Sequence, residues 1–541
     1  MKQILYTVLA LSLILSSCEK FLEETPTGSL TTEANLTSNA SGVALATGAY
    51  RSLTTVTMGM SEWGGNQVGG LEYFTGKAYS QYMGAKLWKY EGDTENGEED
   101  YFTYPWRYWY QGVRDCNLAI KKIPEITGMG ADDKSKYIGE VRTLRAWYYF
   151  NLVRYYGDVV YNTDVVTDLA DVQRPRRPLV AIYDKIIVPD LEFAVNESKL
   201  VDERSTGRVT KHVARALLAD VYLTMAGYPY QEQKTDTTKA WCTDGLWAMT
   251  AYPVNTAGAK ELLQKAKTQL DFLYGLYPIG DFADLHLPEM DNKGGAIWQV
   301  QFLLGTSIHG AVQCFVPLSS HTTVLTTETG TIIPSAAYSA SFNALDKRIA
   351  DRAYFYYNDT YAAKYDVNEG PAGKFPLPFL YKYYDINCMK VKGESGLNFN
   401  LYRYADILLM LTEVNWSLRQ LGVSVADDDI VKGINEVKTR AGLPTLQASD
   451  ITLLDIMSER AYELIFENKM LWDMRRTRRA LVDGVGQFTR IENLVGHQPT
   501  NFNYKFSAKH LLSPVSVNEI SNNTKVLQNY GWLPVQVGQG N

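Results

Sequence analysis

The chain has 541 residues, of which 45% are hydrophobic and 21% are charged, and its formal net charge is −7. This composition is typical of a globular protein and excludes a disordered chain. The acidic balance argues against nucleic acid as a partner, because such a partner calls for a basic patch or stripe.

The first residues predict a secretion signal and a lipid anchor. Lys2 precedes a short apolar run over residues 4–15, and the sequence Leu-Ser-Ser-Cys follows, ending at Cys18. This order is typical of a cleaved secretory signal, and the apolar run is shorter than the roughly 20 residues of a membrane span. The four residues ending at Cys18 resemble a bacterial lipobox. We therefore expect a signal peptide over residues 1–17 and lipidation of Cys18, with more than one acyl chain because stable anchoring takes about two.

We expect residues 18–40 to form a tether and residues 41–541 to form one body. The first part of this body, about 41–226, is expected to be mainly helical. Residues 142–156 carry apolar side chains at spacings of four, four and three, which is typical of an amphipathic helix. Gly157 is expected to end this helix. Further helices are expected over 181–195, where Pro189 must kink or break the helix, and over 209–225.

Residues 227–400 predict a loop-rich lobe. Gly, Pro, Thr and Asn are frequent there, with a strand-like run over 296–302 and one helix over 259–274. Loops of this kind commonly carry the binding surface of a protein. Helices are expected again over 401–418, 428–441 and 452–479, and an irregular tail, 480–541, is expected to pack back on them.

Aromatic residues are the strongest departure from average composition, with 11 Trp, 37 Tyr and 18 Phe. Between Ser61 and Trp106 the rings follow no period of 3.6 or 2, so they do not form one face of a regular element. Exposed rings beside amides and carboxylates suit sugars, because a ring packs on sugar C–H groups while polar groups pair with hydroxyls. Any single ring can instead be a core residue. We expect this for Trp109, Tyr110 and Trp298, and we expect Asn117 to be buried with them. The residues predicted to contact a ligand are Trp63, Tyr73, Tyr79, Trp88, Tyr90 and Tyr101, together with His309 and His321 from the loop-rich part.

A catalytic interpretation rests on three glutamates at spacings of four, Glu459, Glu463 and Glu467. A close carboxylate pair is what a glycosidase needs. Arg460, Arg475 and Arg476 lie nearby in sequence, however, and favour a structural charge network instead. No metalloprotease, nucleophile-elbow or phosphate-loop motif accompanies the glutamates, so we predict no catalytic residue.

Cofactor and disulfide signals are weak. Plentiful Asp and Asn are compatible with a structural calcium ion, but no EF-hand pattern indicates one, and we predict no cofactor and no metal. The remaining cysteines are far apart and form no C-x-x-C pair. We expect them to be mostly free and buried, although sequence alone leaves their pairing open: Cys116, Cys242, Cys314 and Cys388.

Six segments, in chain order, carry a resemblance to a known family. They are 18–26, 140–158, 207–223, 402–410, 434–444 and 459–476, and the second reads EVRTLRAWYYFNLVRYYGD. Together they resemble the SusD/RagB family of Bacteroidetes outer-membrane nutrient-binding lipoproteins. The resemblance implies a mainly α fold, with a tetratricopeptide-like scaffold of helix pairs and an irregular lobe that contains short strands.

The resemblance also implies a function without chemistry. Members of this family are lipid-anchored at the outer membrane, face the cell exterior and sit over a TonB-dependent (SusC-like) barrel. Their ligand is usually an oligosaccharide, and the nature of the glycan is not encoded in any motif we find. Two alternatives stay open, a peptide-binding RagB-like subunit of a peptide importer and, less favoured, a surface glycosidase.

Overall fold

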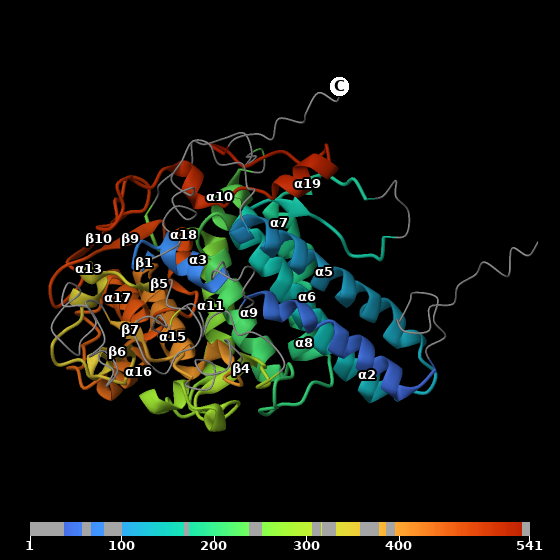
Figure 1. Cartoon of the computed structure of the whole chain (residues 1–541), viewed down its shortest axis with the longest axis horizontal. Helices are drawn as coiled ribbons and strands as arrows, with labels where there is room; N and C mark the ends of the chain where they lie inside the picture. Colours follow the sequence, from blue (N-terminus) through green and yellow to red (C-terminus); the bar gives the residue numbers. More distant parts are fainter. Residues whose placement is uncertain are drawn as a thin grey trace, which may run out of the picture.

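The structure is a computed structural model, and it describes residues 37–56, 67–80, 100–166, 172–236, 238, 251–305, 315, 332–357, 378–385 and 395–532 (Figure 1). The predicted signal peptide and Cys18 lie outside these ranges. Among the described helices, none combines the length and the apolar character that crossing a membrane requires.

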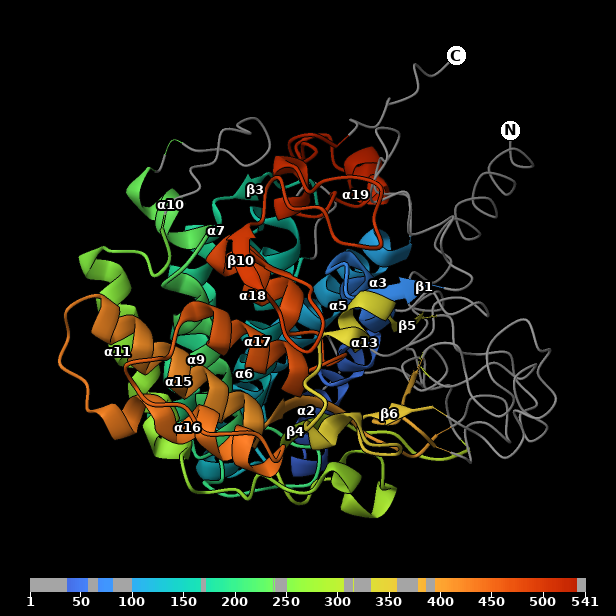
Figure 2. The same ribbon diagram turned by 90° about the vertical axis from the view of Figure 1, so that its left-hand side faces the viewer.

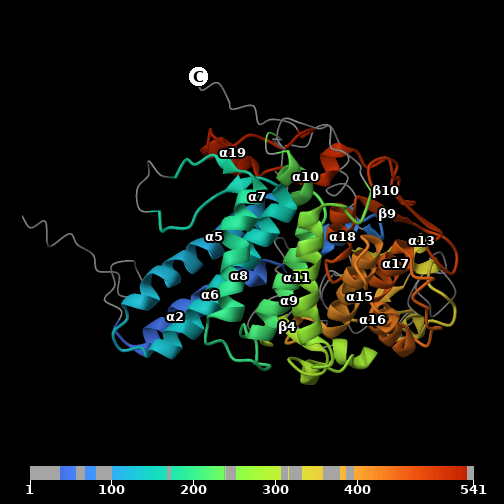
Figure 3. The same ribbon diagram turned by 180° about the vertical axis from the view of Figure 1, so that it is seen from behind.

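Helices dominate and pack side by side in chain order. α5, α6, α8, α9, α11, α15 and α16 each contact the next one in this series (Figures 1 and 3). The array confirms the predicted mainly α fold with helix pairs as its scaffold. The longer helices are α2 (Asn39–Gly48), α5 (Asp100–Lys122), α6 (Ala131–Tyr156), α8 (Val188–Asn196), α9 (Lys211–Met225), α11 (Ala257–Leu273), α15 (Tyr404–Gln420), α16 (Asp427–Arg440) and α17 (Leu453–Glu463).

α6 lies at the centre of the helical part. Gly157 ends it with a φ of 74°, a left-handed conformation that glycine adopts without strain, as predicted. The predicted apolar stripe is buried, but so is almost every side chain from Gly139 to Tyr156. The helix is therefore covered on more than the one face that its periodicity indicates. α5 and α8 pack against it, and the tail reaches its end, where the backbone N–H of Ser513 donates to the carbonyl of Tyr155 at 2.7 Å.

Pro189 changes the helix around it without ending it. α7 (Leu179–Ile182) continues into a π-helical turn, Tyr183–Ile187, and then into α8. Proline lacks an N–H and its ring crowds the preceding turn, so a wider turn accommodates it. The predicted kink at Pro189 is thus a π-helical turn.

The C-terminal helices differ from the prediction at two points. The expected helix over 401–418 begins only at Tyr404, because Phe399–Arg403 forms strand β8. The expected helix over 452–479 is two helices, α17 and α18 (Met470–Thr477), separated by Phe466 and Asn468, whose φ angles are 57° and 59°. A helix cannot pass through left-handed residues, so the chain turns there.

The described strands form two-stranded antiparallel ladders. β1 (Ala78–Ser80) pairs with β5 (Ile332–Pro334), β4 (Ala296–Val300) with β8, and β6 (Phe355–Tyr356) with β7 (Phe379–Leu380). β5 also contacts β7, which places β1, β5, β6 and β7 together on one side of the molecule (Figure 2). Elsewhere β2 (Val159–Val160) pairs with β3 (Arg176–Arg177), and β9 (Arg479–Val482) with β10 (Arg490–Asn493). These short strands confirm the lobe of loops and small sheets.

Candidate functional site

The β1–β5 ladder joins the two parts of the chain in which ligand contacts are predicted. Tyr79 lies opposite Ile333, and Ser80 lies opposite Ile332. Residues 81–99 follow Ser80 in the chain, and residues 316–331 precede Ile332. The aromatic segment and the segment that contains His321 are therefore attached at neighbouring points of one ladder. Tyr79 itself is 46% exposed there.

A cluster of tyrosines lies beside this ladder, on β6 and just after β7. Ile333 belongs to a small apolar core with Tyr356 and Phe379, and Tyr381 and Tyr384 pack against it half-buried. The rings of Tyr381 and Tyr384 stack with centroids 4.8 Å apart, and each lies within 5.7 Å of Tyr356. We call Tyr356, Tyr381 and Tyr384 the lobe tyrosine cluster.

Polar groups surround the lobe tyrosine cluster. His286 approaches Tyr381 edge-on with centroids 4.4 Å apart, and the Arg352 guanidinium lies 5.4 Å from the centre of the Tyr356 ring. Tyr381 and Tyr384 are half-buried, whereas Tyr356 is only 2% exposed and belongs to the core. Partly exposed rings, an imidazole and a guanidinium are groups that recognise carbohydrate. Our sequence prediction missed this cluster. The available signal was two tyrosine-rich runs in the lobe, residues 354–357 and 381–384.

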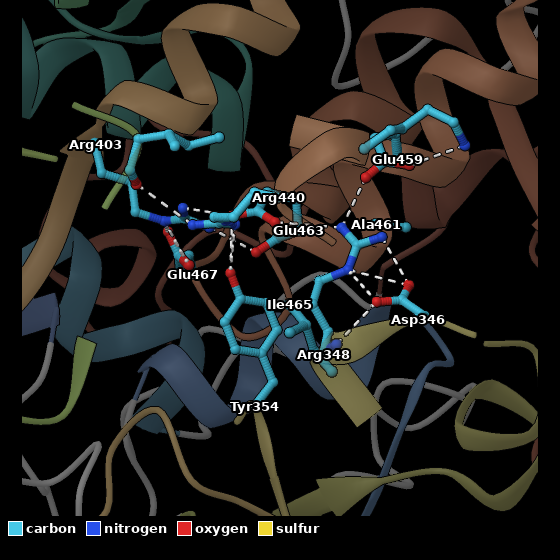
Figure 4. A network of polar contacts seen from close by, with 12 residues as sticks. Asp346, Arg348, Tyr354, Arg403, Arg440, Glu459, Ala461, Glu463, Ile465 and Glu467 are labelled. Atoms are coloured by element: carbon cyan, nitrogen blue, oxygen red, sulfur yellow. Dashed lines mark hydrogen bonds and ion pairs between the residues drawn. The ribbon is translucent and has the colours of Figure 1, made fainter. Parts of the chain in front are cut away.

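A buried charge network includes Tyr354, two residues before Tyr356 of the cluster (Figure 4). Arg348 is fully buried and pairs with Asp346 at 2.8 Å, with Glu459 at 2.7 Å and with Glu463 at 3.2 Å. Asp346 and Arg348 belong to the lobe, whereas both glutamates are on α17. The network therefore crosses between the lobe and the C-terminal helices.

Glu463 is the centre of this network. Its carboxylate also accepts hydrogen bonds from Arg403 at 2.6 Å, from Tyr354 at 2.8 Å and from Arg440 (Figure 4). The three guanidinium groups hold the pKa of Glu463 well below its usual range against the opposing effect of burial. A fully buried carboxylate is tolerated only with such partners.

Glu467 extends the network toward β7. It accepts from Lys382 at 2.6 Å and from Arg403 at 2.7 Å, and these cations lower its pKa. Tyr354 and Lys382 thus face the network, while their neighbours Tyr356 and Tyr381 form the cluster.

All three glutamates at spacings of four are ion-paired, as the predicted charge network requires, but with other partners than those predicted. Arg460 pairs instead with Asp406 and Asp473, and Arg476 with Glu413. Glu467 also lies beyond the end of α17, so the three glutamates do not share one helix. A glycosidase acid needs a raised pKa, whereas those of Glu463 and Glu467 are lowered.

The predicted ligand contacts have different outcomes. The structure corrects the prediction for Tyr73, which is only 5% exposed. Its ring packs in the core against that of Phe502, with the ring centroids 5.2 Å apart. Tyr79 is exposed, as a ligand-contacting ring must be. Tyr101 lies in the first turn of α5, and the position of its side chain is not described. The other predicted contacts lie outside the described residues: Trp63, Trp88, Tyr90, His309 and His321.

The predicted core residues are confirmed. Trp109 and Trp298 are buried, as is Asn117, and Tyr110 is half-buried. Cys116 is free and buried, and burial raises the pKa of its thiol. The other three cysteines of the body lie outside the described residues. No group of His, Cys, Asp or Glu side chains in the described part of the chain is arranged to hold a metal ion.

Comparison with known proteins identifies the family. Residues 319–532 match the SusD family model, and residues 20–223 match a model described as starch-binding associating with outer membrane. A SusD superfamily protein of known structure from Parabacteroides distasonis is 32% identical, with a TM-score of 0.79, and the match covers 92% of this chain and all of that one. The protein belongs to the SusD family.

Two further relatives extend the comparison. SusD-like protein P2 of Formosa agariphila is 26% identical over 88% of this chain and 91% of its own length. Surface glycan-binding protein A of Bacteroides thetaiotaomicron, solved in complex with laminarihexaose, shares the fold with a TM-score of 0.69 at 18% identity. That match covers 91% of this chain and all of the other.

Proposed function

We propose that this protein is a cell-surface lipoprotein that captures oligosaccharides and delivers them to a TonB-dependent outer-membrane barrel. The observation that carries the proposal is the exposed ring of Tyr79 with the half-buried rings of Tyr381 and Tyr384, in a member of the SusD family. Lipidation of Cys18 would anchor the protein, and binding would need neither a cofactor nor a catalytic residue. The laminarihexaose complex of a relative with the same fold makes β-glucan oligosaccharides the first ligands to try.

The supporting physical argument is one of rigidity. Rings that recognise sugar must be held in place, because ordering them on binding costs free energy. The buried network holds the residues next to these rings, because Tyr354 donates to Glu463 on α17 and Lys382, which follows Tyr381, donates to Glu467. A shallow stacking site of this kind binds weakly, on the order of micromolar to millimolar.

Calorimetric titration of residues 19–541 tests the ligand. The panel contains laminarihexaose, other oligosaccharides and peptides, and each mixture is chromatographed afterwards. Saturable binding of one glycan class without breakdown supports the proposal. Binding of peptides alone would favour the peptide importer, and cleavage products that disappear in a Glu463→Gln variant would favour a glycosidase.

A matched pair of variants tests the surface. Tyr79 and Tyr530 have similar exposure, 46% and 43%, but Tyr530 lies in the tail, away from the lobe. We expect Tyr79→Ala to weaken glycan binding about 10-fold, which corresponds to ~1.4 kcal/mol for one stacked ring, and Tyr530→Ala to leave it unchanged. Equal effects of the two substitutions would mean that the glycan does not bind at the surface around Tyr79.

Affinity purification tests the partner and the anchor. The full chain, extracted in mild detergent from its native outer membrane, is expected to carry a TonB-dependent barrel with it in about equal amount. A Cys18→Ala chain is expected to lose its membrane attachment. A wild-type protein that purifies alone would contradict delivery to a barrel.

A further inference from the structure

A pocket separate from the lobe lies between the first half of α5 and the short helix α19 (Val517–Asn522) near the C-terminus. Its volume is about 280 Å³. It shares no residue with the lobe tyrosine cluster. The residues that line it and carry the argument below are Trp106, Arg107, Tyr110, Val172, Asn518 and Asn522.

One wall of the pocket is aromatic and rigid, with the half-buried ring of Tyr110 packed against Trp106, which is only 4% exposed. The rings of Trp106 and Tyr110 lie 5.1 Å apart, and Tyr156 approaches Trp106 edge-on at 5.0 Å from behind. The Tyr110 hydroxyl donates to the carbonyl of Val160 at 2.9 Å. Neither ring has to be ordered when a ligand arrives, which lowers the cost of binding.

The indole of Trp106 also joins the two sides of the pocket. Its N–H donates to the Glu519 carboxylate at 3.2 Å, and Asn523 donates to the other oxygen of that carboxylate at 2.9 Å. Glu519 therefore fixes the position of α19 against α5. The pocket is built by contacts between distant parts of the chain and not by a single loop.

The rim of the pocket is polar. Arg107, Asn518 and Asn522 are exposed. The Arg107 guanidinium lies over the Tyr108 ring at 5.6 Å, and it forms no ion pair with any described residue. The Asn522 amide donates to the backbone of Asn518 at 2.7 Å, and its side-chain oxygen is directed to no described donor. Amide and guanidinium groups are thus available beside the half-buried ring of Tyr110.

This combination selects a class of ligand. A phosphorylated ligand calls for several cations, whereas the lining has one arginine and one carboxylate. A purely apolar ligand would leave the amides unpaired, at a cost for each buried polar group. Ring faces with amides at their edge suit a molecule that has C–H faces and hydroxyl edges, and the volume suits one or two sugar rings, being just below the range of drug-sized sites.

We propose that this pocket binds a neutral mono- or disaccharide, at a site separate from the lobe surface. The aromatic wall packs on the C–H face of the sugar, and Arg107, Asn518 and Asn522 pair with its hydroxyls. The inference does not depend on the proposed glycan surface of the lobe. A protein with both sites would bind a short sugar in this pocket and a longer glycan at the lobe.

Saturation-transfer NMR with D-glucose, N-acetyl-D-glucosamine and maltose as probes tests the proposal on residues 19–541. We expect transfer to at least one probe, with a dissociation constant on the order of 1 mM. A pair of matched variants locates the site. Val172 lines the mouth and is 54% exposed, and Leu527 is 58% exposed and does not line the pocket.

Val172→Trp fills the mouth and is expected to abolish transfer, whereas Leu527→Trp and Tyr79→Ala leave it unchanged. The double variant Asn518→Ala/Asn522→Ala, at two exposed positions, is expected to weaken binding at least 5-fold. Both variants should keep the wild-type melting temperature, which separates lost binding from lost folding.

Three results would overturn the proposal. They are no transfer to any probe, transfer that persists in Val172→Trp, and competition by free L-amino acids in place of sugars. Loss of transfer in Tyr79→Ala would assign the small sugar to the lobe and also overturn it. Failure of laminarihexaose to bind the lobe, by contrast, would not contradict sugar binding in this pocket, because the two sites are tested with different probes and variants.

Discussion

Tyrosines are dense in two regions of this protein, the second half of α6 and the ladders of the lobe, and their surroundings differ. Tyr148, Tyr149 and Tyr156 on α6 are fully buried, and their hydroxyls donate to the carbonyls of Ala49, Asn162 and Phe102 at 2.6–2.8 Å. Tyr381 and Tyr384 in the lobe are half-buried and stack on each other. The same residue type joins helices in one region and presents ring faces in the other.

The role of a tyrosine in this protein therefore depends on the residues around it, and not on how many aromatic residues its segment contains. Burial raises the pKa of Tyr148 and Tyr156 well above the usual value, since neither hydroxyl can ionise without solvent. Helices and the tail cover α6 on several sides, whereas Tyr381 and Tyr384 are only half-buried. Tyr148→Ala and Tyr381→Ala test this contrast directly.

Tyr148→Ala is expected to have the largest effect. It opens a cavity between α6 and α5, where the ring lies against Gly112, and should lower the free energy of unfolding by ~3–5 kcal/mol in urea denaturation. Tyr148→Phe, which removes only the bond to Ala49, should cost ~1 kcal/mol. Tyr381→Ala is the matched substitution in the lobe and should cost less than half as much as Tyr148→Ala. Equal costs would contradict the contrast between the two regions.

Glu463→Gln should lower stability by about 3 kcal/mol, because it leaves three buried guanidinium groups without their central anion. The folded-state pKa of Glu463 is depressed, so its contribution is present above pH ~4.5 and is lost as the pH falls toward the lower folded-state pKa. Melting temperatures of wild type and variant should therefore converge in acid. If the two stay equally far apart at all pH values, the ionised carboxylate is not the source of the stability.

Gly433→Ala probes the scaffold alone. A Cβ atom at this position of α16 would lie 2.1 Å from the carbonyl oxygen of Leu408 on α15, and a backbone atom cannot move aside alone. We expect a loss of about 2 kcal/mol in chemical denaturation. Gly486→Ala would meet no atom, but its φ of 77° strains any side chain. Gly48, in α2 with open space around it, is the better control, and Gly48→Ala should be neutral or slightly stabilising. A neutral Gly433→Ala would mean that α15 and α16 are not in such close contact.

Glu72→Gln should have the smallest effect and the opposite sign. Glu72 is buried, and burial raises its pKa from 4.5 to about 8, although the backbone N–H of Asn468 donates to it at 2.7 Å. A raised carboxyl pKa favours the folded state below pH ~4.5, and this advantage is lost as the pH rises toward 8. The variant should therefore be more stable than wild type at pH 8.5, by roughly 1–2 kcal/mol, and no more stable at pH 4. Thermal melts at the two pH values measure this, and a benefit at both would contradict a protonation effect.

Much of the scaffold was predictable because its signals are local. The period of the apolar residues before Gly157 marks a helix whatever its neighbours are, and Gly157 ends it through its own conformational freedom. The run over 452–479 was predicted as one helix because the left-handed residues Phe466 and Asn468 carry no sequence signal of their own. Neither is a glycine, so only the packing of the chain holds them in that conformation.

The candidate site was predictable only in part. Tyr73 and Tyr79 are six residues apart in a segment without periodicity, and nothing local distinguishes them. α3 (Gln67–Phe74) carries Tyr73 into the core beside Phe502, whereas β1 places Tyr79 on the surface opposite Ile333. Their different roles depend on residues more than 250 positions away in the chain.

The class of fold, the order of the helices and the family followed from the sequence alone, because these depend on periodicity and motifs. Packing of the whole chain settled which cations neutralise Glu463, which tyrosines form the lobe cluster, and that α5 and α19 enclose a pocket. Arg348, Arg403 and Arg440 approach Glu463 from separate elements. Such contacts join parts of the chain that no local pattern relates, so they are settled only when the whole chain packs.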